Sequence, residues 1–170
     1  MGTRAGFTLL AALLAFAGCG HHGPEPVYPD KSPDAPARSV ASLLAAPDSL
    51  RASGVVYRAT AFIYRNFQPT LPGSPDTRLR AGVRLFATED DSILARPKYA
   101  WVIHGADIWG AELQWSYVSG HGFPPYVEAS AFGGPEWPPE DSVRTIVGIP
   151  DSTGFIQLLR CPDGIITRLD

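Results

Sequence analysis

Regular alternation of apolar and polar residues over the C-terminal part of the chain limits what it can fold into. The segment LRAGVRLFA (79–87) places leucine, valine and alanine on one face, with Arg80 and Arg84 on the other. The segments 112–117 and 127–132 alternate in nearly the same way. Because successive side chains of a strand point to opposite faces, the pattern predicts antiparallel strands with one buried and one solvated face.

Further strands are predicted where the alternation is weaker but β-branched and aromatic residues are abundant. These strands cover 55–67, 143–149, 154–160 and 164–169. Pro162-Asp163-Gly164 lies between the last two and is typical of a hairpin turn. With 17 glycines and 17 prolines, the chain is also rich in turn-forming residues.

About eight strands without alternating helices predict an all-β fold over residues 55–170. We expect an antiparallel two-sheet sandwich with immunoglobulin-like or fibronectin-like architecture. A small β-barrel is the alternative. Residues 39–54 are expected to form one or two short helices, with Ser39 as the cap, Pro47 ending the first turn and Asp48 starting a second.

Residues 1–18 have the features of an export signal. Arg4 precedes an apolar stretch over 7–17, which is shorter than the roughly 20 residues needed to span a membrane. We therefore expect this segment to be removed after export.

The end of this segment, Phe16-Ala17-Gly18-Cys19, resembles the lipobox of bacterial lipoproteins. The resemblance covers residues 1–19 only and implies that Cys19 becomes the N-terminus and carries acyl chains such as palmitate, anchored in membrane lipid. Gly20, in place of Asp, implies transfer to the outer membrane. Ala15-Phe16-Ala17 also fits an ordinary signal peptidase site, and cleavage there would give a secreted or periplasmic protein.

The sequence after Cys19 is expected to be a tether. Residues 20–39 contain five prolines and show no apolar periodicity, so residues 19–38 cannot bury enough surface to fold alone. Without residues 1–18, which hold one of the 14 basic residues and no acid, the formal charge is −4. No basic cluster is present to neutralise phosphates, so no nucleic-acid partner is expected.

One candidate site lies in the segment 99–117, which reads as a hairpin with its tip at Gly105–Gly110. In that register Trp101 faces Trp115 and His104 faces Glu112. His104, Glu112 and Asp107 would then form a cluster able to bind a sugar hydroxyl or a metal. The same residues also fit an aromatic core pair beside a surface charge pair.

The second candidate site is a group of aromatic residues in or beside loops rich in glycine and proline. Trp109, Phe123, Tyr126 and Trp137 would suit a glycan or a protein partner if they were exposed, or would seal the ends of the domain if buried. Ser119 and His121 lie near each other, but no nucleophile elbow or third catalytic member accompanies them.

These observations predict a membrane-anchored binding or structural module in the cell envelope, without a cofactor, a metal or catalytic residues. The alternative is an envelope hydrolase or metal-binding protein with its site on 104–121. Cys161 is the second of two cysteines. Its position at a strand end, next to Arg160, predicts an inward-facing, poorly reactive thiol; a Cys19–Cys161 disulfide belongs to the soluble alternative.

Overall fold

The computed structural model describes residues 31–170 except 53, 69–75, 89–94 and 119–125. Cys19, Phe123, Ser119 and His121 therefore lie outside the described residues.

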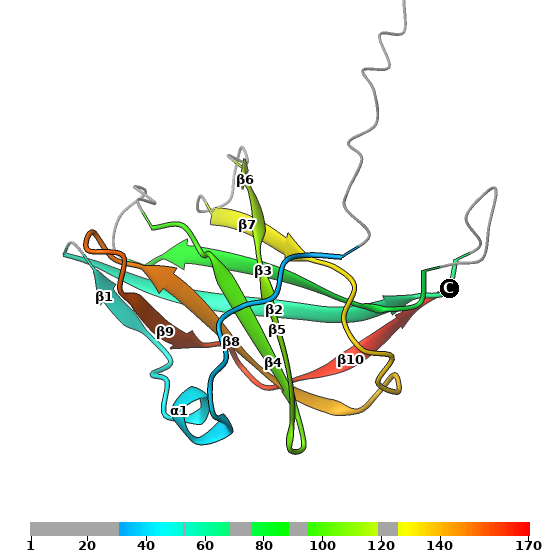
Figure 1. Ribbon diagram of the computed structural model, residues 1–170. Helices are drawn as coiled ribbons and strands as arrows, with labels where there is room; N and C mark the ends of the chain where they lie inside the picture. Colours follow the sequence, from blue (N-terminus) through cyan, green and yellow to red (C-terminus); the bar gives the residue numbers. More distant parts are fainter. Residues whose placement is uncertain (1–30, 53, 69–75, 89–94, 119–125) are drawn as a thin grey trace, which may run out of the picture.

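Within these described ranges, ten strands form a single sheet that curls into a nearly closed barrel (Figure 1). The strands are β1 (Leu50–Ala52), β2 (Val55–Asn66), β3 (Leu79–Ala87), β4 (Tyr99–His104), β5 (Asp107–Glu112), β6 (Gln114–Val118), β7 (Tyr126–Ala131), β8 (Ser142–Pro150), β9 (Ile156–Arg160) and β10 (Gly164–Leu169). Their order is β5-β4-β8-β10-β2-β3-β7-β6, with β1 added to β2 and β9 to β8. The all-β prediction is confirmed. The shape fits the barrel alternative, and the two-sheet sandwich is not confirmed.

The alternation in the sequence places the strands of the barrel wall correctly. Strand β3 covers the predicted range, and its leucines and valine are fully buried while Arg84 is exposed. Strands β2, β7, β8 and β10 also lie within a residue or two of the predicted ranges. Figure 1 shows β2 and β3 running side by side along the length of the barrel.

The predicted hairpin at Pro162-Asp163-Gly164 is wrong. Strands β9 and β10 do not pair with each other; both pair with the same edge of β8. Arg160 pairs with Ile146 and Gly164 pairs with Val143. Between these two pairs, the three residues 161–163 lie opposite only two residues of β8, 144 and 145. This is a β-bulge, which a proline without an N–H tolerates. After the bulge, β10 leaves β8 and pairs in parallel with β2, which joins the two walls of the barrel.

Of the one or two short helices predicted for the segment 39–54, one is present among its described residues. Helix α1 (Val40–Leu44) begins at Ser39, whose hydroxyl accepts a hydrogen bond from the Ser42 amide at 3.2 Å, as predicted. The second predicted turn is replaced by β1, which forms a tight hairpin with β2. Gly54 supplies the positive φ of 83° that this turn needs. Pairing with β2 thus overrides the weak local preference for a helical turn.

The predicted register of the segment 99–117 is also wrong. Strands β4 and β5 are joined by the two-residue turn Gly105–Ala106, and His104 pairs with Asp107. The positive φ of 59° at Gly105 suits the first central position of such a turn. Trp101 is therefore opposite Gly110, and Trp115 belongs to β6, where it pairs with Ala129 of β7.

Residues 32–35, which fall within the range predicted as a tether, are bound to the barrel. The Ser32 amide donates to the Phe132 carbonyl at 3.0 Å, and the Ser32 hydroxyl accepts from the Phe132 amide at the same distance. Further along, the Ala35 amide donates to the Gly110 carbonyl and the Glu112 amide to the Pro33 carbonyl. We call residues 32–36 the strap; it links the outer edge of β5 to the end of β7.

The barrel has one core inside and a second outside. The inner core is made largely of alanine, valine and leucine from all the long strands, with Tyr57 and Trp109. The outer core lies between α1 and the outer side of β4 and β8, and contains Leu43, Trp101 and Ile146. The indole of Trp101 donates to the Pro36 carbonyl at 3.0 Å, so the strap and α1 are fixed to the barrel by the same side chain.

Candidate functional site

The candidate site is a groove on the outer face of β2, β3 and β7, centred on Gly82. Gly82 pairs with Phe62 on one side and with Ser130 on the other. Because glycine has no side chain and serine has a small one, the outer surface of the sheet is depressed at the middle of this cross-strand row. The rows before and after it carry larger side chains. The resulting groove has a volume of about 450 Å³ and is lined by Thr60, Ala61, Phe62, Tyr64, Gly82, Arg84, Glu128, Ser130 and Leu169. We call it the Gly82 groove.

Two aromatic rings form one wall of the Gly82 groove. Phe62 and Tyr64 are stacked, with ring centroids 5.1 Å apart and an angle of 23° between the planes. Phe62 is 49 % exposed, although it lies in the middle of a long strand. A half-exposed ring at the centre of a sheet contributes little to the core, so the Phe62 ring, stacked on the partly buried Tyr64, is available for a ligand.

The rim opposite the aromatic wall is polar. The Arg84 guanidinium donates to the Glu128 carboxylate at 3.0 Å and lies over the Tyr126 ring at 5.0 Å from its centroid. This pair fixes the direction of both charged groups, because each side chain is held by a second strand. The hydroxyls of Thr60 and Ser130 complete the lining, so the groove offers donors, acceptors and an apolar surface together.

His104 and Glu112 lie at opposite ends of the β4–β5 hairpin, so the cluster expected from the sequence is not assembled. His104 pairs with exposed Asp107, whereas Glu112 pairs with Tyr99. The carboxylate at His104 comes instead from Asp141, whose Oδ2 is 2.8 Å from the His104 Nε2.

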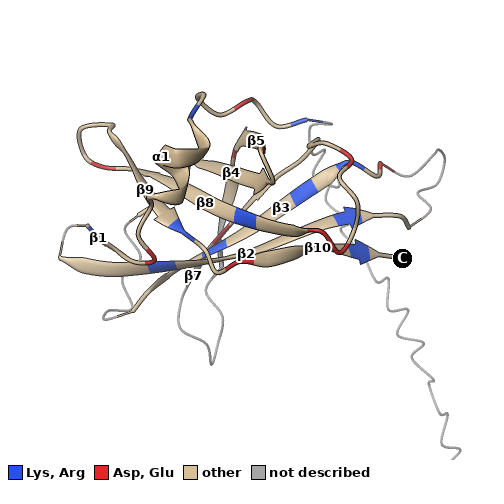
Figure 2. Ribbon diagram, turned by 90° about the horizontal axis from the view of Figure 1, so that it is seen from below, with Lys and Arg blue, Asp and Glu red and all other residues tan. Residues whose placement is uncertain are grey.

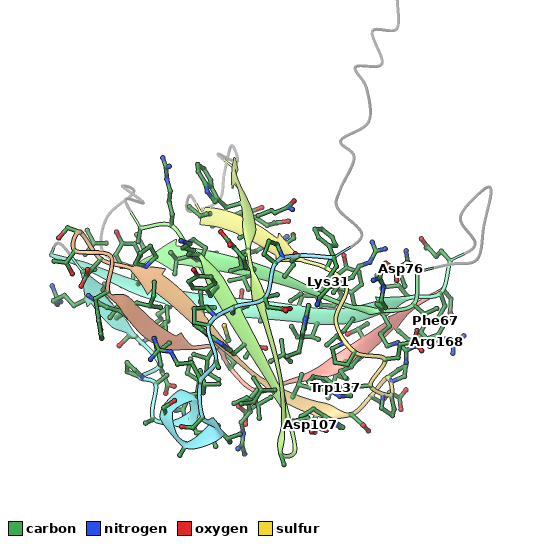
Figure 3. The ribbon with its side chains drawn as sticks, in the orientation of Figure 1. Lys31, Phe67, Asp76, Asp107, Trp137 and Arg168 are labelled. Carbon is green, nitrogen blue, oxygen red and sulfur yellow. The ribbon has the colours of Figure 1, made fainter. Side chains whose placement is uncertain are left out.

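Trp137 packs against His104, with 5.0 Å between the ring centroids, and both lie near one end of the barrel. Figure 3 shows Trp137 close to Asp107 at the tip of the β4–β5 hairpin, and Phe67 and Arg168 where β2 and β10 end. Arg65 is 8 % exposed and donates to the carbonyls of Glu136 and Trp137 at 3.1 and 3.0 Å. These contacts seal this end of the barrel, which gives Trp137 a structural role.

Two other predicted aromatic residues have different surroundings. Trp109 lies within β5, is 8 % exposed and belongs to the inner core. A side chain at Gly134 would come within 2.7 Å of the Trp109 ring, so the tight packing there depends on glycine. Tyr126 begins β7 and is half-buried against Phe86 and Arg84, at the edge of the Gly82 groove.

Cys161 points inward, as predicted, and is 1 % exposed. Burial raises the pKa of its thiol to about 12. A thiol in this state forms almost no thiolate at neutral pH and is a poor nucleophile.

The described residues show neither a metal site nor a membrane-spanning helix. Within these ranges, no three His, Cys, Asp or Glu side chains come together in a way that could hold a metal ion. In the same part of the chain, no helix is long and apolar enough to cross a membrane. Comparisons with protein-family models, with curated proteins and with solved structures give no match for this chain.

Sequence reasoning did not single out the residues of the Gly82 groove, although two signals were present. Phe62 and Tyr64 have the same parity in β2 as the polar Arg58 and Thr60, and so belong to the solvated face. Gly82 interrupts the polar face of a regular strand, where glycine often marks a close approach to the backbone.

Proposed function

We propose that this chain is a lipid-anchored protein of the cell envelope whose barrel binds glycans in the Gly82 groove. The observation that carries the proposal is the exposed Phe62 ring, stacked on the half-buried Tyr64, beside the depression that Gly82 leaves in the outer face of the sheet. A binding role is consistent with a groove that contains several ligand-facing groups but no assembled catalytic set.

A sugar ring matches the groove better than an apolar ligand does. The C–H groups of a pyranose carry partial positive charge and pack on the negative face of an aromatic ring. Its hydroxyls both donate and accept, which suits the paired Arg84 and Glu128 on the opposite rim. The floor at Gly82 is backbone, which lets a flat ring approach the sheet.

The anchor would hold the barrel near a membrane surface. Lipidation at Cys19 is proposed from the lipobox-like Phe16-Ala17-Gly18-Cys19 and the proline-rich residues that follow. Residues 20–30 separate Cys19 from the first described residue, Lys31, which immediately precedes the strap. The strap runs over the β4–β5 side of the barrel (Figure 1), so it does not cover the Gly82 groove.

The binding proposal is tested with the mature chain and a panel of neutral oligosaccharides, with affinity measured by calorimetry. We expect Phe62→Ala to lower the affinity for a bound glycan about tenfold, the loss of roughly 1.4 kcal/mol of stacking. Gly82→Val should abolish binding without unfolding the barrel, because a Cβ there meets only the Phe62 carbonyl, at 3.8 Å.

Phe155→Ala is the matched control. Phe155 is 65 % exposed and lies in the turn before β9, outside the groove, so its loss should leave glycan affinity unchanged. Equal losses in Phe155→Ala and Phe62→Ala, or full binding by Gly82→Val, would contradict the proposed site.

The anchor is tested by mass spectrometry of the membrane fraction. We expect a chain that begins at Cys19 and carries acyl groups, and a Cys19→Ser variant that leaves the membrane fraction. An unmodified chain beginning at Gly18 would support the soluble alternative instead.

A further inference from the structure

A second depression adjoins the Gly82 groove on the outer face of the barrel. It has a volume of about 740 Å³ and lies between β2, the segment that follows α1, and the β-bulge after β9. Its lining contains three arginines, two aspartates and a threonine, which are Arg58, Arg144, Arg160, Asp48, Asp163 and Thr60. We call it the arginine depression.

The arginine depression and the Gly82 groove are two parts of one surface. Thr60 belongs to the lining of both, and the lining passes along β2 from Arg58 to Phe62 without interruption. Arg58, Thr60 and Phe62 are all exposed, whereas Ala59 and Ile63, which have the opposite parity, are buried. The three exposed side chains therefore stand in a row on the outer face of one strand.

The length of this row is that of an oligomeric ligand. Four residues separate Arg58 from Phe62, which is about 13 Å at about 3.3 Å per residue in a strand. The distance is more than one sugar ring covers. A ligand that stacks on Phe62 and also reaches Arg58 must therefore contain more than one sugar, with the Thr60 hydroxyl between them as a donor or acceptor.

The arginine depression has one more positive charge than it has negative charges. Arg160 is paired with Asp48 at 2.6 Å, and Arg144 with Asp163 at 3.4 Å. Arg58 has no ion-pair partner among the described residues, so its guanidinium is available to a ligand. Figure 2 shows the basic positions of β8 and β9 on the side turned to the viewer.

The charges in the Gly82 groove, in contrast, are balanced. Arg84 and Glu128 are the charged residues of its lining, and they pair with each other at 3.0 Å. The groove therefore suits a neutral sugar ring, and the arginine depression suits a ring with an acidic substituent. A carboxylate matches the planar donors of a guanidinium, which can bind both of its oxygens.

We propose that the Gly82 groove and the arginine depression together bind an acidic glycan, with a neutral sugar on Phe62 and the carboxylate of a uronic acid at Arg58. The inference rests on the glycan binding proposed above and adds the class of glycan. Two separate observations point to this ligand. The shared Thr60 makes the two hollows continuous, and the unpaired Arg58 gives one of them a positive charge.

The test uses the mature chain and three linear glucose tetrasaccharides, with affinity measured by calorimetry. One tetrasaccharide is neutral, and the other two carry glucuronic acid in place of glucose at one end or at the other. Glucuronic acid alone and inorganic phosphate are the comparison ligands. We expect one of the two acidic tetrasaccharides to bind about fivefold more tightly than the neutral one, and the difference to shrink as salt is raised.

Two variants separate the parts of the site. Arg58→Gln should remove the advantage of the acidic tetrasaccharide and leave the affinity for the neutral one unchanged. Phe62→Ala should lower both affinities by the same factor. Arg38→Gln is the matched control, because Arg38 is also exposed, has no ion-pair partner among the described residues and lines neither hollow. It should bind all three tetrasaccharides as the parent does, and thermal unfolding checks that each variant is folded.

The outcomes distinguish this inference from the glycan proposal on which it rests. Equal binding of the three tetrasaccharides, still weakened by Phe62→Ala, would overturn the acidic specificity and support the neutral groove. Acidic binding that does not respond to Phe62→Ala, or that phosphate displaces at the same concentration, would overturn the inference by revealing a simple anion site. An equal loss in Arg58→Gln and Arg38→Gln would show a general effect of charge and also overturn it. Absence of binding by every tetrasaccharide would overturn both proposals.

Discussion

The two walls of the barrel are built from similar strands, but the outer face of one is covered by other parts of the chain and the outer face of the other is exposed to solvent. On the wall formed by β4, β8 and β9, α1 and the strap cover the outer face, and Trp101 and Ile146 are fully buried there. We call this the covered wall. On the open wall, formed by β2, β3 and β7, the outer face is left to solvent, and Phe62 is half exposed.

The difference separates apolar residues that hold the fold from apolar residues that are free for binding. Trp101 fits between Gly110 and Gly148, where any side chain would come within 2.8 Å of the indole. Gly82 on the open wall has no such neighbour, since a Cβ there would meet only a carbonyl at 3.8 Å. Glycine on the covered wall makes room for the core, whereas glycine on the open wall leaves a groove.

The largest expected difference between the walls is in stability. Trp101→Ala should lower the free energy of unfolding by about 3–5 kcal/mol, because it empties the outer core and releases the Pro36 carbonyl. Phe62→Ala should change it by no more than about 1 kcal/mol, since the ring is half exposed. Urea denaturation of both variants measures this, and equal losses would contradict the division into walls.

A smaller difference with opposite signs is expected from adding a single methyl group to each wall. Gly148→Ala places a Cβ 2.8 Å from Trp101 and 2.9 Å from Ile156, and should destabilise the barrel by about 1–3 kcal/mol. Gly82→Ala makes only an ordinary contact with the Phe62 carbonyl, at 3.8 Å, and should stabilise the strand by roughly 0.5–1 kcal/mol. Thermal unfolding of the two variants should shift the midpoint in opposite directions, and a destabilised Gly82→Ala would show hidden crowding in the groove.

The alternation in the sequence was sufficient to predict individual strands, because it reflects only which side of a strand is buried. It could not predict how the strands pair. The hairpin expected at Pro162-Asp163-Gly164 failed because a proline-rich turn and a β-bulge require the same residue types. Only pairing with the edge of β8, the strand that precedes β9, decides between them.

The candidate site was less predictable for a related reason. His104 was identified as a residue with a carboxylate neighbour, but its partner is Asp141, 37 residues away. Trp109 was grouped with loop aromatics because it lies between glycines, whereas it fills the inner core. Phe62 lies on the same face of β2 as the polar Arg58 and Thr60. Its position in the alternation, rather than its apolar character, would have predicted a side chain on the surface.

The smallest expected effect concerns Cys161, which lies in the β-bulge where the covered wall passes to the open wall. Because burial raises its pKa from the ordinary 9.0 to about 12, the thiolate fraction at pH 8 falls, and the native thiol should react with an aromatic disulfide reagent on the order of a thousandfold more slowly than the urea-unfolded chain. The same shift links stability to pH. Between 9.0 and about 12 the folded chain keeps a proton that the unfolded chain loses, so the contribution of Cys161 is complete below pH 9 and is lost as pH rises through this window.

Cys161→Ala should therefore lose less stability than the parent between pH 9 and 10, by at most about 1.4 kcal/mol, when urea unfolding is measured at each pH. Parallel curves for the two chains would show that the thiol is solvated in the folded state. Rapid labelling of the native protein would show that the bulge opens readily, and a Cys19–Cys161 disulfide would favour the soluble alternative.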